Sequence, residues 1–266
     1  MNVTGSFRSR LERASALTQR GDAMTRTAKR PADRLRPVTI TPGFIRSADG
    51  SVLIEIGRTR LVCTATVEQN VPPWLRGAGK GWVTAEYGML PASTGSRNRR
   101  PGPGRVNSRG TEIQRLIGRA LRAGTNLEAL GGNTITVDCD VLEADGGTRT
   151  AAITGGWVAL ACAVAKARKD GRLPDGPDPL VEQVVATSCG IVGGRALLDL
   201  NYREDREADV DMNVVMTPDG RLIEVQVSGE ETTFRRSDLG RLLRLAQSGC
   251  ERLARKQVRA VKGKQA

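Results

Sequence analysis

Residues 133–155 read NTITVDCDVLEADGGTRTAAITG, and this stretch decides the fold class. In its first half every second residue is apolar: Ile135, Val137, Cys139 and Val141. Such alternation predicts a strand over 133–141 with one buried face. After two glycines, Ile153 and Trp157 begin an apolar stripe at helical spacing, which predicts a helix from about Ala151 to Lys169. A strand, a glycine turn and a helix in direct succession indicate a mixed α/β fold.

Segments on both sides of this stretch add further strands and helices. Two strands are predicted around a turn at Gly57, and another near 81–87. The pattern T-x-x-Q at Thr111 resembles a capping box and predicts a helix that begins there. After a glycine- and proline-rich linker at 170–179 the strand patterns resume, and a final helix begins near Ser237. This order predicts an α/β (α+β) fold of two similar sheet-plus-helix halves in a single domain.

Both ends of the chain differ in composition from its middle. Residues 1–29 are rich in arginine and offer little that would anchor them to a core, so we predict a disordered basic N-terminal extension. An ordered domain is expected over 30–260, followed by a basic C-terminal tail over 261–266.

The charge of the chain points to a polyanionic partner. The 266 residues contain 41 Lys and Arg against 29 Asp and Glu, a formal net charge of +12. Residues 97–122 contain eight arginines and one acid, Glu112. Arginine binds phosphate through a planar fork, so this segment favours nucleic acid. A solvated basic face without a specific ligand is the alternative, and charge alone does not separate the two.

Cysteine and histidine usage excludes several kinds of chemistry. The five cysteines are an odd number without C-x-x-C spacing and lie among apolar neighbours, as expected of reduced thiols in the cytoplasm. The chain has no histidine, which excludes a histidine-dependent triad and a histidine-ligated zinc site. Neither a run of about 18 apolar residues nor a signal-peptide core is present, so no membrane span is predicted and the cytoplasm is expected.

A candidate anion site lies in the glycine turn, which we define as residues 145–150 (DGGTRT). Gly147 allows close backbone approach, Thr148 adds a hydroxyl and Arg149 a charge, and the helix that follows offers free N–H groups. Taken alone, such a turn is more often an ordinary helix cap. Arg109, expected just before the helix at Thr111, would suit the same anion. The alternative is that Arg109 is one more member of a solvated basic run.

A candidate cation site lies in an acidic segment of this basic chain: Glu204, Asp205, Glu207, Asp209 and Asp211. Strand alternation puts Asp209, Asp211 and Asn213 on one face. Oxygen ligands of this kind suit Mg²⁺ or Mn²⁺, whereas an exposed acidic edge strand is about equally compatible with the segment. An anion site, a cation site and an arginine-lined approach are together the parts that phosphoryl transfer needs.

Several runs of the sequence resemble the bacterial ribonuclease PH family. They are RPV at 36–38, GWVTAEYGMLPAST at 81–94, TEIQRLIGRALRA at 111–123, TVDCDVLEADGGTRTAAITG at 136–155 and DMNVVMTPDGRLIEVQ at 211–226. The resemblance covers about 30–256 and implies a phosphorolytic 3′→5′ exoribonuclease, also called a tRNA nucleotidyltransferase. Inorganic phosphate would attack the last phosphodiester bond of a tRNA precursor and release a nucleoside diphosphate, and the reverse reaction would add nucleotides.

The resemblance also implies roles for particular residues. Phosphate would be held by Arg109, Gly147, Thr148 and Arg149. Asp205 and Asp211 would bind Mg²⁺, which differs from strand alternation, because alternation places Asp209 beside Asp211. Arg97 and Arg100 would bind RNA, and the catalytic set would be Arg109, Arg149, Asp205 and Asp211. The family forms a hexameric ring, a trimer of dimers.

One departure from the family and two competing readings bear on activity. The family usually continues Gly-Thr-Ala-Glu-Gly after Gln226, whereas this chain has Val227, Ser228, Gly229, Glu230 and Glu231. A non-catalytic RNA-binding ring subunit is the main alternative, and a phosphorolytic enzyme for other RNA substrates is the second. Inactive subunits typically lose the phosphate-site arginine or the aspartates, and this chain retains them.

Overall fold

The computed structural model describes residue 26, residues 30–100 and residues 108–265. The chain divides into a unit over Met1–Pro31 and a unit over Ala32–Ala266, and the fold given below is that of the second. The predicted disorder of 1–29 falls, apart from Arg26, outside the described residues.

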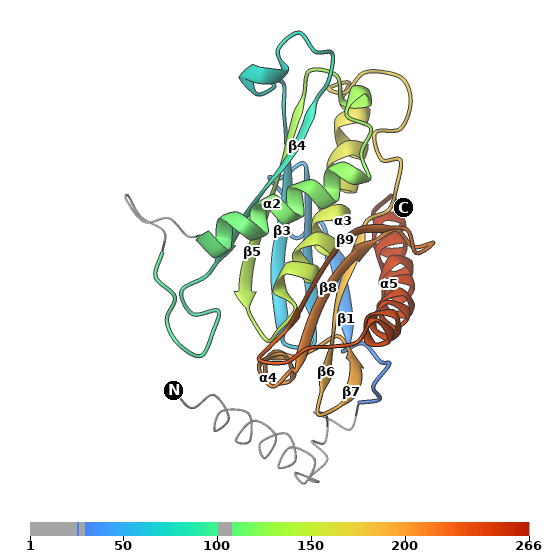
Figure 1. Ribbon diagram of the computed structural model, residues 1–266. Coiled ribbons are helices and arrows are strands. Elements are labelled where there is room, and N and C mark those ends of the chain that lie inside the picture. Colours follow the sequence, from blue (N-terminus) through green and yellow to red (C-terminus); the bar gives the residue numbers. More distant parts are fainter. Residues whose placement is uncertain (1–25, 27–29, 101–107, 266) are drawn as a thin grey trace, which may run out of the picture. The chain divides into compact units, whose positions relative to one another are not determined.

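A five-stranded sheet forms the first half of this unit (Figure 1). Its strands are β1 (Val38–Pro42), β2 (Gly50–Ile56), β3 (Thr59–Glu68), β4 (Trp82–Met89) and β5 (Thr134–Glu143). Their order is β1-β2-β3-β5-β4, and the pairing is antiparallel except between β4 and β5, which are parallel. The predicted alternation of β5 is confirmed, because its odd-numbered residues from Ile135 to Val141 are buried.

A four-stranded antiparallel sheet forms the second half. It contains β6 (Val185–Val192), β7 (Arg195–Leu198), β8 (Val210–Met216) and β9 (Leu222–Gly229) in the order β7-β6-β8-β9. Every residue of β6 is buried, because helices pack against this strand. The predicted α/β fold with two sheet-plus-helix halves is confirmed.

Helix α3 (Thr148–Lys169) lies between the two sheets and belongs to both cores. It packs on β2 and β3 on one side and on β6 on the other, so all residues from Thr150 to Val164 are buried. Glycine allows the close approach: a Cβ on Gly155 would lie 2.8 Å from the side chain of Ile54. In the part of the chain that the structure describes, α3 alone is long and apolar enough to cross a membrane, yet 89% of that apolar window is buried in the protein. A helix covered on all sides needs the same composition.

The described residues form three other helices, α2 (Ser108–Ala123), α4 (Tyr202–Arg206) and α5 (Arg236–Gln265), and α2 and α5 pack on the sheets. Two short 3₁₀ turns, Pro73–Leu75 and Glu128–Leu130, lie in loops. The helix start predicted at Thr111 is wrong, because α2 already includes Ser108, and Gln114 bonds Glu86 on β4 instead of reaching back to the helix start. Residues 261–265 continue α5, where a separate tail was predicted.

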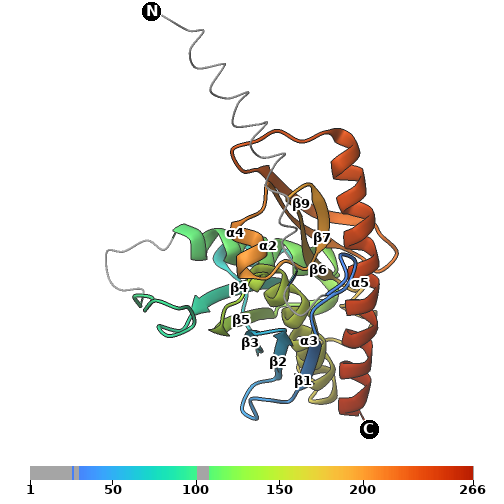
Figure 2. The ribbon, with the colours of Figure 1, turned by 90° about the horizontal axis from the view of Figure 1, so that it is seen from below.

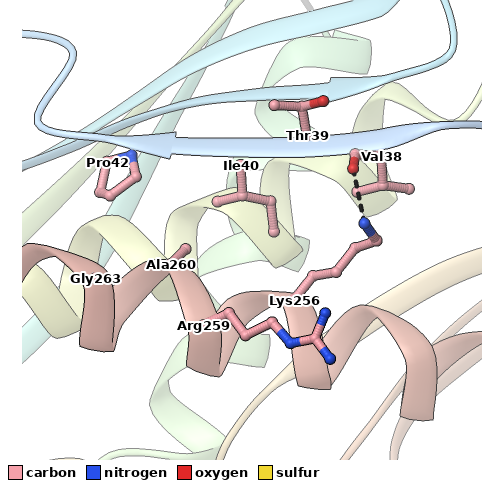
Figure 3. Close-up of a pocket in the computed structure, with 8 residues that line it drawn as sticks. All are labelled: Val38, Thr39, Ile40, Pro42, Lys256, Arg259, Ala260 and Gly263. Atoms are coloured by element: carbon pink, nitrogen blue, oxygen red, sulfur yellow. Dashed lines mark hydrogen bonds between the residues drawn. The ribbon is translucent and has the colours of Figure 1, made fainter.

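The long helix α5 also covers the outer edge of the first sheet (Figure 2). β1 is an edge strand, and the ammonium group of Lys256 donates to the carbonyl oxygen of Val38 at 3.0 Å. A groove of about 420 Å³ lies between this strand and the last turns of α5, with Arg259 on its helix side (Figure 3). An edge strand covered by a helix is protected from pairing with other chains.

Candidate active site

A cavity of about 680 Å³ lies where the two halves meet. Its walls come from the segment after β4, the start of α2, the glycine turn, α4 and β8. The predicted phosphate and metal residues all line it: Arg109, Gly147, Thr148, Arg149, Asp205 and Asp211. Among these predicted residues, Arg109 and Asp211 are 102 positions apart in sequence and still line one space.

The glycine turn needs both of its glycines. Gly146 and Gly147 have φ of 78° and 69°, in the left-handed region that favours glycine. A Cβ on Gly146 would also lie 2.6 Å from the backbone carbon of Asn201 in the second half. Helix α3 begins directly after them, and no side chain caps its start. The N–H groups of its first turn therefore have no intrahelical acceptors, and they give this end of α3 a partial positive charge that suits an anion.

Two side chains that the sequence did not single out orient the residues of this turn. The hydroxyl of Tyr87 on β4 donates to the hydroxyl oxygen of Thr148 at 2.9 Å, and burial raises the pKa of Tyr87. The guanidinium of Arg149 donates to the amide oxygen of Gln226 on β9 at 3.3 Å. Tyr87 had a signal in the sequence, because a hydroxyl follows Val83 and Ala85 on the buried face of a strand.

The carboxyl groups of Asp205 and Asp211 lie together in this cavity, where the charge of Arg149 acts on both. Asp205 is on α4, whose start is fixed by a capping box between Asn201 and Glu204. Asp211 is on β8, where the amide of Asn213 donates to its Oδ2 at 3.4 Å. The other oxygen of Asp211, Oδ1, is buried and has no hydrogen-bond partner among the described residues.

Burial makes the ionised form of both carboxyl groups unfavourable. Desolvation, with the charge of Asp205 second, raises the pKa of Asp211 from 3.8 to about 6. Desolvation also raises the pKa of Asp205, although the charge of Arg149 opposes it. An orphaned carboxylate oxygen beside a second carboxylate fits a divalent cation. Among the described residues, no three Asp, Glu, Cys or His side chains are placed to hold a metal ion together. Water or substrate oxygens would therefore complete the coordination of an ion bound by Asp205 and Asp211.

Asp205, and not Asp209, lines the cavity together with Asp211. Asp209 precedes β8, its backbone N–H donates to the carbonyl of Ile191, and the described residues that line the cavity include Asp205 and not Asp209. Strand alternation placed Asp209 beside Asp211, and in the structure Asp209 lies directly before β8, which begins at Val210.

The segment after β4 forms one wall of the cavity and contains the predicted RNA-binding arginines. Its chain is held by the side-chain amide of Asn98, which donates to Ser93 at 3.2 Å and to Thr94 at 2.9 Å. Arg97 is exposed between two residues that line the cavity, and Arg100 is exposed beside the undescribed residues 101–107.

The departure at Val227 lies outside the cavity. Val227 is on β9 opposite Met212 and packs partly against the core, as a valine on a strand does. Its neighbour Ser228 pairs with Asp211, and Glu230 contributes to the raised pKa of Asp211 through its charge.

Family models match most of this unit. The model described as 3′ exoribonuclease family, domain 1, matches residues 34–166, and the domain 2 model matches residues 182–249. The chain belongs to the 3′ exoribonuclease family. Ribonuclease PH of Corynebacterium efficiens is 53% identical over 240 residues, covering 90% of this chain and 97% of the relative. Ribonuclease PH of Rhodopirellula baltica is 55% identical over 231 residues, covering 86% and 94%.

Two solved structures share the fold. A chain of the Archaeoglobus fulgidus exosome with RNA bound to the active site superposes with a TM-score of 0.75 at 23% identity, covering 92% of this chain and 97% of that one. An archaeal exosome core chain gives 0.72 at 21% identity, covering 93% and 96%. The resemblance and the activity predicted from the sequence are confirmed: the chain is a phosphorolytic 3′→5′ exoribonuclease of the ribonuclease PH type.

Proposed function

We propose that this exoribonuclease removes nucleotides from the 3′ ends of tRNA precursors in the cavity between its two halves. A phosphate oxygen bonds to the terminal phosphorus, the bond to the preceding O3′ breaks, and a nucleoside diphosphate leaves. The shortened RNA keeps a 3′-hydroxyl, whose proton comes from hydrogen phosphate, so the reaction balances and runs in both directions. The observation that carries this proposal is that the uncapped start of α3, Arg109, Arg149 and the carboxylate pair all line one cavity.

Phosphate and the RNA backbone are both anions, so the site must first offset their repulsion. The start of α3 with Thr148 and Arg149 lines the cavity, and Arg109 on α2 lines it as well, so these donors are available to one anion. Preorganised donors of this kind stabilise charge without reorganising during the reaction. Positioning and charge neutralisation provide most of the catalysis in phosphoryl transfer.

We assign Mg²⁺ to Asp205 and Asp211, because a pair of desolvated carboxylates with one orphaned oxygen is unfavourable until a cation neutralises it. When bound, the ion supplies positive charge for the leaving 3′ oxygen. Arg149 lines the same cavity and its charge acts on both carboxylates, so the proposed anion and cation sites are neighbours.

The RNA itself is proposed to approach along the arginine-rich segment. Arg97 and Arg100 are exposed on the segment that lines the cavity at Ser96 and Asn98, and they suit backbone phosphates upstream of the reacting 3′ end. Contacts to phosphates place the strand without reading its sequence, which fits an enzyme that trims different precursors.

Self-association as a hexameric ring, a trimer of dimers, is proposed on two grounds. The solved relatives are named as parts of exosomes. Large apolar side chains are also exposed on this chain, including Trp74 at 71% and Leu222 at 53%. Light scattering on the purified protein tests it, and a monomer would contradict it.

The five buried, reduced cysteines favour a cytoplasmic location, which fractionation of cells would test.

A trimming assay tests the proposed reaction. A tRNA precursor with a few extra 3′ nucleotides is incubated with Mg²⁺, with and without inorganic phosphate. Phosphate-dependent shortening with release of nucleoside diphosphates is expected for the wild type and is expected to be lost in Arg149→Ala. Arg168→Ala, at the other end of the same helix, is the matched control and is expected to trim normally.

Two outcomes would contradict the proposal. Release of monophosphates without phosphate would indicate hydrolysis, and the phosphate site would then be wrongly assigned. RNA binding without any shortening would instead favour the non-catalytic ring subunit.

A further inference from the structure

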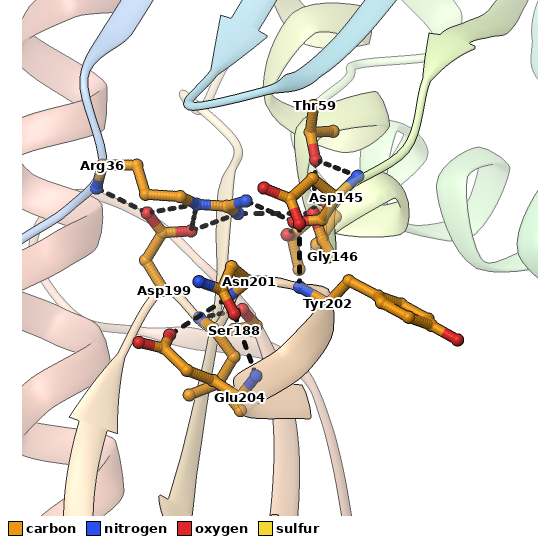
Figure 4. A network of polar contacts seen from close by, with 12 residues as sticks. Arg36, Thr59, Asp145, Gly146, Ser188, Asp199, Asn201, Tyr202 and Glu204 are labelled. Atoms are coloured by element: carbon orange, nitrogen blue, oxygen red, sulfur yellow. Dashed lines mark hydrogen bonds and ion pairs between the residues drawn. The ribbon is translucent and has the colours of Figure 1, made fainter. Parts of the chain in front are cut away.

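A buried ion pair joins the two halves beside the glycine turn (Figure 4). Arg36, just before β1, and Asp199, just after β7, expose 7% and 5% of their side chains, and the closest charged atoms are 2.7 Å apart. The backbone N–H of Arg36 also donates to Asp199 at 2.6 Å. Asp199 has φ of 57°, an uncommon conformation for a residue other than glycine. Buried charge and backbone strain at the same point indicate that the surrounding structure enforces this geometry.

Arg36 uses the rest of its guanidinium to hold the glycine turn. Its terminal nitrogens donate to the carbonyl oxygen of Asp145 and, at 3.3 Å, to that of Gly146. The hydroxyl of Thr59 donates to the same Gly146 oxygen at 2.7 Å and accepts from the N–H of Asp145 at 2.9 Å. Among the described residues, neither Arg36 nor Thr59 lines the cavity. The two carbonyl oxygens are therefore bonded to groups outside the cavity, where they do not repel a bound phosphate.

Asp199 fixes the other side of the cavity. Its N–H donates to the carbonyl of Ser188 at 2.7 Å, and the N–H of Leu200 donates to the Ser188 hydroxyl at 3.1 Å. Next along the chain is α4, whose first N–H, that of Tyr202, donates to the carboxylate of Asp145 at 3.3 Å. Asp205 is part of this helix, so the ion pair links the glycine turn to the helix that positions Asp205.

We propose that Arg36 is a positioning residue for phosphate. It does not touch the ligand; with Asp199 it holds the glycine turn so that its N–H groups, and not its carbonyl oxygens, face the bound anion. It also sets the distance from this turn to Asp205. The proposal rests on the phosphate site described under the proposed function.

Three variants test this role: Arg36→Lys, Thr59→Val and, as a matched control, Arg172→Lys. Lysine keeps the charge at residue 36 but cannot bond Asp199 and two carbonyls at once. Valine at residue 59 keeps the volume and the ion pair but removes both hydroxyl bonds to the turn. Arg172 forms an ion pair with Asp49 at the same distance, 2.7 Å. This pair has no described hydrogen bond to the glycine turn.

The measurements are the KM for phosphate and kcat of trimming, phosphate binding by calorimetry, RNA affinity without phosphate, and Tm. Arg36→Lys is expected to raise the phosphate KM and Kd about tenfold, as the loss of a bond to a charged group does, and Thr59→Val about fivefold. The RNA affinity of both variants should stay within about twofold of the wild-type affinity, because neither substitution removes a contact to RNA. Arg172→Lys is expected to lower Tm without changing the phosphate KM.

The outcomes separate this role from the proposed function. If the wild type trims with phosphate while Arg36→Lys and Thr59→Val keep its phosphate KM and Kd and only lose Tm, Arg36 is merely structural and the inference is wrong. If the wild type neither binds phosphate nor trims, the proposed phosphate site is wrong, and the positioning role is overturned together with it.

Discussion

Replacing Asp211 by Asn is expected to stabilise the metal-free protein while removing its trimming activity. Burial and the neighbouring Asp205 raise the pKa of Asp211 from 3.8 to about 6. At about 1.4 kcal/mol per pKa unit, the ionised carboxylate costs the folded state up to about 3 kcal/mol. Asparagine is neutral at every pH, so the variant does not carry this cost.

The gain in stability should depend on pH in a defined direction. Because the folded pKa is raised, the folded state binds the proton more tightly than the unfolded state does. The wild type is therefore stabilised by protonation below about 3.8, and this contribution is lost as the pH rises through about 6. Relative to the wild type, Asp211→Asn should gain about 3 kcal/mol at about pH 8 and about half of that at about pH 5.

Urea unfolding in the presence of a chelator at these two pH values measures the difference. Asp219→Asn is the control: Asp219 is exposed, and its pKa is lowered by the Thr217 hydroxyl and by Arg221, so its replacement should bring no gain at the higher pH. The same stability difference at both pH values for Asp211→Asn would refute the reasoning. Adding Mg²⁺ should stabilise the wild type and not the variant, and equal stabilisation of both would place the ion elsewhere.

Three further variants probe the cavity and the core. Arg149→Lys keeps the charge but loses the planar fork, and kcat/KM for phosphate should fall about ten- to a hundredfold, measured by initial trimming rates. Tyr87→Phe removes the hydroxyl that orients Thr148, and the phosphate KM should rise about fivefold with kcat nearly unchanged; an unaltered KM would show that Thr148 needs no support. Leu160→Ala empties a fully buried position on α3 and should lower the free energy of unfolding by about 2–5 kcal/mol in urea titrations. A smaller loss there would mean that the two sheets close over the gap.

Periodicity predicted the faces of the strands but not their partners. The alternation over 133–141 correctly identified the buried face of β5. That β4 runs parallel to β5, on the side away from β3, follows from the crossover through α2, and no periodicity within a strand carries that information. T-x-x-Q at Thr111 misled because the same spacing also occurs inside a helix, where Gln114 is free to bond a neighbouring strand.

The candidate site was predictable in part. Gly147, Thr148 and Arg149 are consecutive, so their chemistry was visible in the sequence, and the resemblance to ribonuclease PH pointed to Asp205 where strand alternation pointed to Asp209. Arg36 was quoted only as part of a shared run, because its partner Asp199 is 163 positions away. Contacts at that separation depend on how the two halves pack, which local patterns do not encode.

The single helix α3, shared by both sheets, links the halves in folding as well as in architecture. The first family model ends at residue 166, so a fragment ending there would keep α3 except its last three residues but expose the face that β6 covers. A fragment beginning at residue 182 would keep α5 but lack α3, the other helix that packs on its sheet. Neither piece encloses a complete apolar interior, so the two halves should unfold in one cooperative transition and evolve as an inseparable pair.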